Sequence, residues 1–321
     1  MLFSIRHQTR FKYESAVQES IMEIRKHPRT EGAQRCLSFD LFVSPKVRIQ
    51  QYRDYLGNTI HYFDAPGKHS QLQIIAQAKV ETGAGPVLPD RLPHDAWQEL
   101  DSMVNNGDYW EFLMPSDFAK PTPLLDSLAA ELRVERRDDP LSVVTELNGA
   151  IYGAFEYVPK ATRVDSPIDD ALRARRGVCQ DFAHIITALA RQYLRVPCRY
   201  VSGYLFHGRF DQDRSADGAT HAWVEVLLPG LGWVGLDPTN NLVAGDRHIR
   251  TAIGRDYADV PPTRGVFKGN ARSELFVSVQ VSLEEALAPL EQELLAVPEW
   301  IPSPDEDEAA QLIQQQQQQQ Q

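Results

Sequence analysis

Residues 175–184 read RRGVCQDFAH, a turn signal followed at once by the start of a helix. Gly177 favours the turn, and apolar side chains then recur with helical spacing on one face, at Phe182, Ile186, Leu189 and Tyr193. This pattern places Cys179 in the first turn of a buried helix. Unpaired N–H groups and the positive end of the helix dipole favour an anion there, so the thiolate of Cys179 is stabilised. The stretch therefore predicts a nucleophilic thiol.

Two later stretches carry the groups that a nucleophilic thiol needs. Residues 220–226 (THAWVEV) contain His221, a candidate base, and residues 233–239 (WVGLDPT) contain Asp237, a candidate orienting carboxylate. Pro229 and its neighbouring glycines mark a turn between them. An antiparallel hairpin centred on Pro229 pairs His221 with Asp237 on one face, which we expect to lie against the Cys179 helix. A turn centred slightly later would move this register by a residue or two.

The composition limits the classes of protein that the chain can belong to. Its 321 residues are 42% hydrophobic, which suggests two domains with a sizeable core. The net charge of −11 argues against nucleic acid as the main partner. Three cysteines, without a CxxC pair, form neither a disulfide framework nor a zinc site, so we expect no metal or other cofactor. No membrane-spanning stretch or signal peptide is recognisable, which predicts a cytoplasmic protein without a membrane partner.

The order of patterns along the chain predicts an α+β fold. Residues 1–85 contain short strands separated by turns, which suggests a β-sandwich-like N-terminal domain, and residues 86–122 form a connecting region. Helices followed by an antiparallel sheet assign the catalytic core to residues 123–275. Residues 276–300 form a C-terminal extension, with helical spacing over 282–295, and the acidic, glutamine-rich tail 301–321 is predicted to be disordered.

Three motifs carry a family resemblance: GVCQDFA (177–183), HAWVEV (221–226) and DPT (237–239), in this order. They resemble the motifs of the transglutaminase-like superfamily of papain-type thiol enzymes, and roughly the first 80 residues resemble the β-rich N-terminal domain of its bacterial members. The resemblance implies a papain-like core, in which the helix that bears the nucleophile packs on an antiparallel sheet. It also implies that Cys179 is the nucleophile, His221 the base and Asp237 the orienter.

The resemblance further implies acyl-thioester chemistry on a peptide or protein substrate. We expect hydrolysis of a peptide or isopeptide amide bond, as in a bacterial cysteine peptidase or amidase. Two alternatives stay open at this point. In a protein-glutamine gamma-glutamyltransferase a lysine amine accepts the acyl group and cross-links proteins, whereas a non-catalytic binding scaffold has no need of all three residues. The oligomeric state is also left open.

The sequence specifies the hydrogen-bond donors of the oxyanion site less clearly than the triad. The backbone N–H of Cys179 can supply one donor, and either the Gln180 side chain or Tyr157 can supply the second. For both side chains the alternative is a packing or capping role.

Four further residues have a structural interpretation, and two of them also have a functional one. Trp223 and Trp233 either wall a narrow acyl tunnel or belong to the core. His184, about one turn beyond the nucleophile, is interpreted as a satisfied or surface histidine. Cys198 lies in an apolar strand, which indicates an inert buried thiol.

Overall fold

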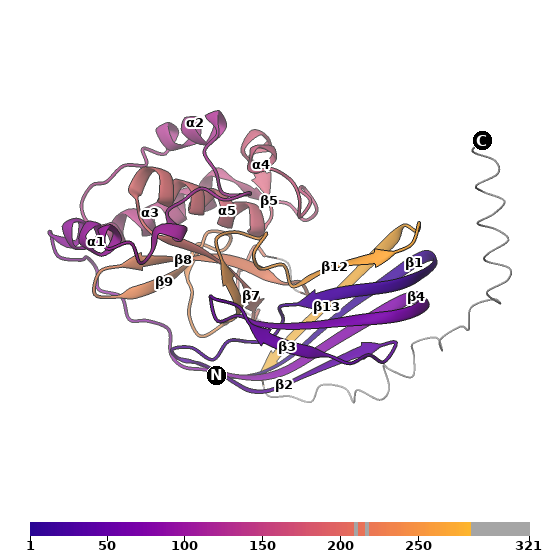
Figure 1. The fold of residues 1–321 in the computed structure, drawn as a ribbon. Coiled ribbons are helices and arrows are strands. Elements are labelled where there is room, and N and C mark those ends of the chain that lie inside the picture. The colour runs from indigo at the N-terminus through magenta and orange to yellow at the C-terminus, as the bar shows by residue number, and fades with distance from the viewer. Residues whose placement is uncertain (209–210, 216–217, 284–321) are drawn as a thin grey trace, which may run out of the picture.

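The computed structural model describes residues 1–208, 211–215 and 218–283, and its fold is α+β, as predicted. A five-stranded sheet carries the candidate site, and the helices gather on one side of it (Figure 1). A six-stranded sheet built from both ends of the described chain lies on its other side. No helix of the described residues is long and apolar enough to cross a membrane.

The five-stranded sheet is antiparallel throughout and has the order β10-β9-β8-β7-β11. Its strands are β7 (Cys198–Leu205), β8 (His221–Leu228), β9 (Gly232–Asp237), β10 (Leu242–Val243) and β11 (His248–Gly254). A separate short parallel pair joins β5 (Glu156–Tyr157) to β6 (Arg176–Gly177). The helices are α1 (Ala96–Asn105), α2 (Pro123–Glu131), α3 (Pro140–Ala154), α4 (Ile168–Ala174) and α5 (Cys179–Leu189), and short 3-10 and π turns cover Trp110–Phe112 and Ala190–Leu194.

The main core lies between α5 and one face of β8. Phe182 and Ile186 of α5 are fully buried in the same cluster as Ala222, Val224 and Val226 of β8. The alternation of β8 therefore places its small and branched side chains on the helix. The odd-numbered residues of β8, which include Trp223 and Glu225, face away from α5.

The N-terminal strands form one sheet instead of the predicted sandwich of short strands. The sheet contains β1 (Leu2–Ile24), β2 (Gln34–Ser44), β3 (Gln50–Arg53), β4 (Thr59–Thr82), β12 (Thr263–Lys268) and β13 (Ser273–Leu283). The apolar pattern of β1 breaks at His7 and Thr9, yet the strand continues through both residues, which are buried. Nδ1 of His7 lies 3.0 Å from the hydroxyl of Tyr204 in β7, so a polar contact between the sheets replaces an apolar one.

Two strands from the C-terminal side complete the N-terminal sheet. β12 and β13 both pair with β1, so the boundary predicted at residue 275 falls inside β13. The helix predicted over 282–295 overlaps β13 at Ser282 and Leu283, where the chain is a strand. The remainder of that prediction, and the tail 301–321, lie outside the described residues. The other domain boundaries stay predictions.

Two side chains of the N-terminal region hydrogen-bond the outer edge of β11. The side-chain amide of Gln34 donates to the carbonyl of Arg250 at 2.9 Å and accepts its N–H at 2.8 Å. Asn58 does the same for Ile253, at 2.8 and 2.9 Å. Each amide thus makes the pair of hydrogen bonds that a residue of a neighbouring strand would make. The backbone N–H and C=O groups of Arg250 and Ile253 at this edge of the sheet are therefore satisfied.

Lys26 predicts a pH dependence of folding stability. Its side chain is fully buried, donates to the hydroxyl of Thr9 at 2.6 Å and makes no ion pair within the part of the chain that is described. Burial lowers the pKa of Lys26 to about 7. The unfolded chain therefore binds more protons between about pH 7 and 10.4, and stability should rise with pH across this window.

We expect Lys26→Met to stabilise the fold most near and below neutral pH, where the native protein must bury the charge. The expected gain is about 2–4 kcal/mol at about pH 6, and it should shrink as the pH approaches 10. Urea unfolding at several pH values measures it, with the exposed Lys79→Met as the control. A loss of stability at every pH would contradict the prediction.

Candidate active site

Cys179 begins α5, as the sequence predicts. Val178 is the residue before the helix, and its N–H donates to the carboxylate of Asp181 at 2.8 Å. The hydroxyl of Thr162 donates to the same carboxylate at 2.5 Å, which fixes the first turn. Cys179 is half-buried, with the unpaired N–H groups of the helix start around it. The local fold therefore presents this thiol at the positive end of a helix.

His221 lies between the thiol and a carboxylate. Its Nε2 is 2.8 Å from Oδ2 of Asp237, and the ring also hydrogen-bonds Cys179. Burial lowers the pKa of His221, but Asp237 and Cys179 outweigh this effect and raise it to about 10. Burial likewise disfavours the charged form of Asp237, yet His221 and His248 hold the pKa of that carboxyl well below its usual range. The arrangement favours an imidazolium next to an ionised Asp237 at neutral pH.

The hairpin register differs from the predicted one in a way that keeps the pair together. Val224 pairs with Leu236 and Leu228 with Gly232, so the turn is centred on Gly230 instead of Pro229. His221 is therefore not directly opposite Asp237 but diagonal to it. When the turn centre moves by one residue, the residue that pairs with any given position moves by two. The side chains of His221 and Asp237 therefore stay on the same face of the hairpin.

The expected contact between α5 and the face of β8 that bears His221 is wrong. The opposite face, with Ala222 and Val224, packs on α5. His221 reaches Cys179 because it is the first residue of β8, at the end of the sheet where α5 begins. Alternation along a strand shows which residues share a face, but it does not show which face the helix covers.

Two residues that the sequence analysis did not identify also bind Asp237. Nε2 of His248 lies 3.2 Å from Oδ2, and Nδ2 of Asn240 donates to the same oxygen at 2.8 Å. Nδ1 of His248 accepts the N–H of Gly245 at 3.3 Å, which leaves the proton of the neutral ring on Nε2. Asn240 lies three residues after Asp237, a spacing that suggests a turn bond, whereas His248 carries no local signal.

The same site offers a set of metal-ligand atoms. One atom each of His221, Asp237 and His248 lies within 4.8 Å of the others, and all three side chains are buried. Nε2 of His221 and Nε2 of His248, however, both lie at hydrogen-bond distance from Oδ2 of Asp237, at 2.8 and 3.2 Å. This is the geometry of two N–H donors sharing one acceptor, which the tautomer of His248 also requires.

The proposed second oxyanion donors occupy different surroundings. The side-chain amide of Gln180 donates to the carbonyl of Val164 at 2.9 Å, which favours the structural alternative for this residue. Tyr157 lies in β5 and pairs with Gly177, two residues before Cys179. Tyr157 is therefore next to the stretch that bears the nucleophile, and its role stays a prediction.

The two tryptophans wall a cavity, but Cys179 does not line it. Trp223 and Trp233 border a space of about 310 Å³ whose other walls include residues of the N-terminal region. Trp223 stacks on His221, with ring centroids 6.0 Å apart. The geometry thus places the Trp223 indole behind the histidine, and neither indole shares this cavity with the thiol.

His184 is a buried, hydrogen-bonded histidine, as one of its interpretations expects. Its Nε2 accepts the N–H of Tyr257 at 3.2 Å, and its ring stacks on Phe118. Burial lowers the pKa of His184 to about 3, so the ring is neutral and contributes to the core.

Differences among the three thiols predict selective alkylation of Cys179. Burial raises the pKa of Cys36 and of Cys198 to about 11, so each carries roughly a hundredth of the thiolate of an ordinary cysteine. Cys179 instead lies at a helix start beside His221. Iodoacetamide at about pH 7.5 should modify Cys179 at least roughly a hundredfold faster, as measured by peptide mass spectrometry over time. Equal rates for the three residues in the folded protein would contradict this prediction.

Comparisons with known proteins show the family to which the chain belongs. Residues 3–81 match the model of the bacterial transglutaminase-like N-terminal region, and residues 126–238 match the model of the transglutaminase-like superfamily. A Mycobacterium leprae protein described as uncharacterized is 33% identical over 279 residues, which cover 86% of this chain and 96% of that protein. The fold and these matches define a family of thiol-dependent enzymes. The chain belongs to the transglutaminase-like superfamily and carries its bacterial N-terminal region.

Two further proteins that resemble this chain are described by an enzyme class. A solved structure from Cytophaga hutchinsonii, described as a candidate cysteine protease, is 25% identical with a TM-score of 0.69, and the match covers 90% of this chain and 92% of that one. A protein-glutamine gamma-glutamyltransferase of Pseudomonas aeruginosa is 30% identical over 130 residues, which cover 36% of this chain and 18% of the transferase.

Proposed function

We propose that the protein hydrolyses peptide or isopeptide amide bonds through an acyl-thioester on Cys179. The observation that carries the proposal is the position of His221, which hydrogen-bonds Cys179 on one side and Asp237, at 2.8 Å, on the other. A nucleophile, a base and an orienting carboxylate in this order are the parts of a nucleophilic acyl transfer. Each part comes from a rigid element: α5, the start of β8 and the end of β9.

The proposed reaction has two steps. The Cys179 thiolate attacks the carbonyl carbon of the amide, and the backbone N–H at the helix start stabilises the resulting oxyanion. His221 then gives its proton to the leaving amine, and the thioester remains on Cys179. In the second step neutral His221 takes a proton from water, which attacks the thioester and releases the acid. Asp237 orients the ring and stabilises its charged form throughout.

Hydrolysis is preferred to amine transfer because of the extent of the similarities. The resemblance to the candidate cysteine protease covers 90% of the chain, and that to the transferase covers 36%. The transferase is nevertheless the second candidate function, because both acceptors use the same thioester. A binding scaffold is the third, and the intact charged pair of His221 and Asp237 argues against it, since binding alone does not require it.

An acceptor experiment tests the proposal. The full chain is incubated with an amide substrate and an excess of a primary amine, with and without a chelator. We expect free acid as the main product and little incorporated amine, with the rate unchanged by the chelator. Dominant amine incorporation would move the protein to the transferases. A Cys179→Ala variant with the activity of the natural chain would refute the thioester.

A further inference from the structure

The cavity behind His221 has the size of a ligand site. It measures about 310 Å³ and lies between residues 32–34 and 82–86 of the N-terminal region and the sheet face that bears Trp223 and Glu225. Small-molecule sites typically measure roughly 300–1,000 Å³. Nothing in the proposed chemistry uses this cavity, because Cys179 does not line it.

One buried hydrogen-bond donor without a partner in the described part of the chain belongs to a residue that lines the cavity. The Trp223 side chain is 1% exposed, and its Nε1 has no hydrogen-bond partner within the described residues. The acceptors nearby are already used. Glu225 accepts from Arg199 at 2.6 Å and from Arg250 at 3.2 Å, and the Gln34 amide is bonded at both ends to the backbone of Arg250. A ligand that offers an acceptor oxygen to Trp223 would satisfy the buried indole N–H.

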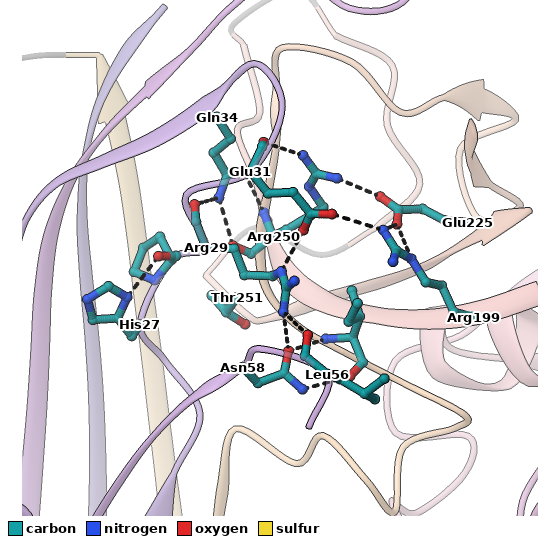
Figure 2. A network of polar contacts seen from close by, with 12 residues as sticks. His27, Arg29, Glu31, Gln34, Leu56, Asn58, Arg199, Glu225, Arg250 and Thr251 are labelled. Carbon is teal, nitrogen blue, oxygen red and sulfur yellow. Dashed lines mark hydrogen bonds and ion pairs between the residues drawn. The ribbon is translucent and has the colours of Figure 1, made fainter. Parts of the chain in front are cut away.

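Charge and shape narrow the class of this ligand. Arg250 and Glu225 line the cavity and form an ion pair at 3.2 Å. The network behind them adds two cations and one carboxylate, Arg29, Arg199 and Glu31 (Figure 2). The surplus positive charge favours an anion. Two indole walls favour a flat apolar body.

The geometry points to a second ligand site in this cavity, for a small aromatic carboxylate whose oxygen accepts the hydrogen bond of Trp223 Nε1. The site is coupled to the candidate triad through two of its walls. Trp223 stacks on His221 with an interplanar angle of 25°, and His248, which also lines the cavity, contacts Asp237 at 3.2 Å. The coupling rests on the proposed function, whereas the binding does not.

Calorimetric titration of the full-length Cys179→Ala chain tests the binding without any activity. Benzoate is the probe, and benzylamine, with the same ring and the opposite charge, is the matched control. We expect saturable binding of benzoate and binding of benzylamine that is at least about tenfold weaker. Absence of saturable benzoate binding, or equal binding of the two probes, would overturn the site.

Two variants locate the binding. Trp223→Phe keeps a flat ring but removes the N–H, and it should weaken benzoate binding about tenfold, as expected for one lost hydrogen bond. Gly245→Ala provides a second measurement in case Trp223→Phe fails to fold. Its added Cβ would lie 3.8 Å from Cα of Gly85, an ordinary contact, and would narrow the cavity, which should also weaken binding. Unchanged affinity in both variants would refute this location.

The coupling has its own readout. In the natural chain, saturating benzoate should change the rate at which iodoacetamide alkylates Cys179, while benzylamine at the same concentration should not. Intact binding with an unchanged alkylation rate would overturn the coupling. Because binding is measured in a chain without the thiol, failure of the proposed hydrolysis would leave the benzoate result standing.

Discussion

Asp237→Asn should lower the turnover of an amide substrate by about 10³–10⁴-fold, because His221 loses the charge that orients its ring and stabilises the imidazolium. The substitution changes one atom of a side chain that is fully buried and 2.8 Å from the ring. An initial-rate measurement of hydrolysis, together with the rate of Cys179 alkylation, would detect the loss.

The hydrogen bonds of Asp237 explain why asparagine cannot substitute for it. Oδ2 faces three donors, on His221, His248 and Asn240, and Oδ1 faces two backbone N–H groups, of Thr239 and Asn240. An asparagine has only one acceptor oxygen, so its NH₂ group must meet donors on one side or the other. Either His221 or the turn after β9 loses its partner. We therefore also expect a moderate loss of stability, of about 1–3 kcal/mol.

Asp139→Asn is the matched control. Asp139 is buried like Asp237 and caps the start of α3, where its Oδ1 accepts the N–H groups of Leu92, Leu141 and Ser142. Its other oxygen faces only the hydroxyl of Ser142, which can accept from an amide. The control should keep its turnover. Near-normal turnover of Asp237→Asn, or an equal loss in both variants, would show that Asp237 is not the orienter.

The sequence predicts the parts of the site that depend on local pattern. Helical spacing after Gly177 locates the start of α5 at Cys179, and β8 and β9 flank the turn that Pro229 marks. These elements are recognisable because each one is specified by its own residues. The hairpin also keeps His221 and Asp237 on one face, since a register change of two residues preserves the alternation.

The features that the sequence does not predict depend on contacts between residues far apart in the chain. His248 reaches Asp237 because β11 pairs with β7, which no spacing near His248 indicates. From the sequence, β12 is assigned to the core and most of β13 to a C-terminal extension, yet both strands pair with β1 at the opposite end of the chain. Buried polar residues such as His7 interrupt the apolar pattern of a strand that in fact continues, because their partners lie on the other sheet.

Glu225 holds together the contact between the two sheets. Its side chain is 5% exposed, and it neutralises Arg199, which is 6% exposed, and Arg250 (Figure 2). Arg250 also donates to the carbonyl of Glu31 at 3.0 Å, so the network continues from β8 into the N-terminal loops. Removal of one partner from a buried ion pair leaves an uncompensated charge, which costs far more than the pair itself contributes.

We therefore expect Glu225→Gln to lower the free energy of unfolding by about 3–5 kcal/mol, as measured by urea denaturation. Glutamine keeps the shape of the side chain but leaves Arg199 and Arg250 facing a neutral amide. The control is Glu31→Gln, since the side chain of Glu31 in the same network is 37% exposed and its loss should cost only about 0–1 kcal/mol. Adding Arg199→Met to Glu225→Gln should recover part of the loss, because it removes the more deeply buried of the two unpaired charges. If Glu225→Gln costs no more than Glu31→Gln, the contact between the sheets does not depend on this charge, and the apolar cluster of Phe3, Tyr204 and Ile249 must hold them together.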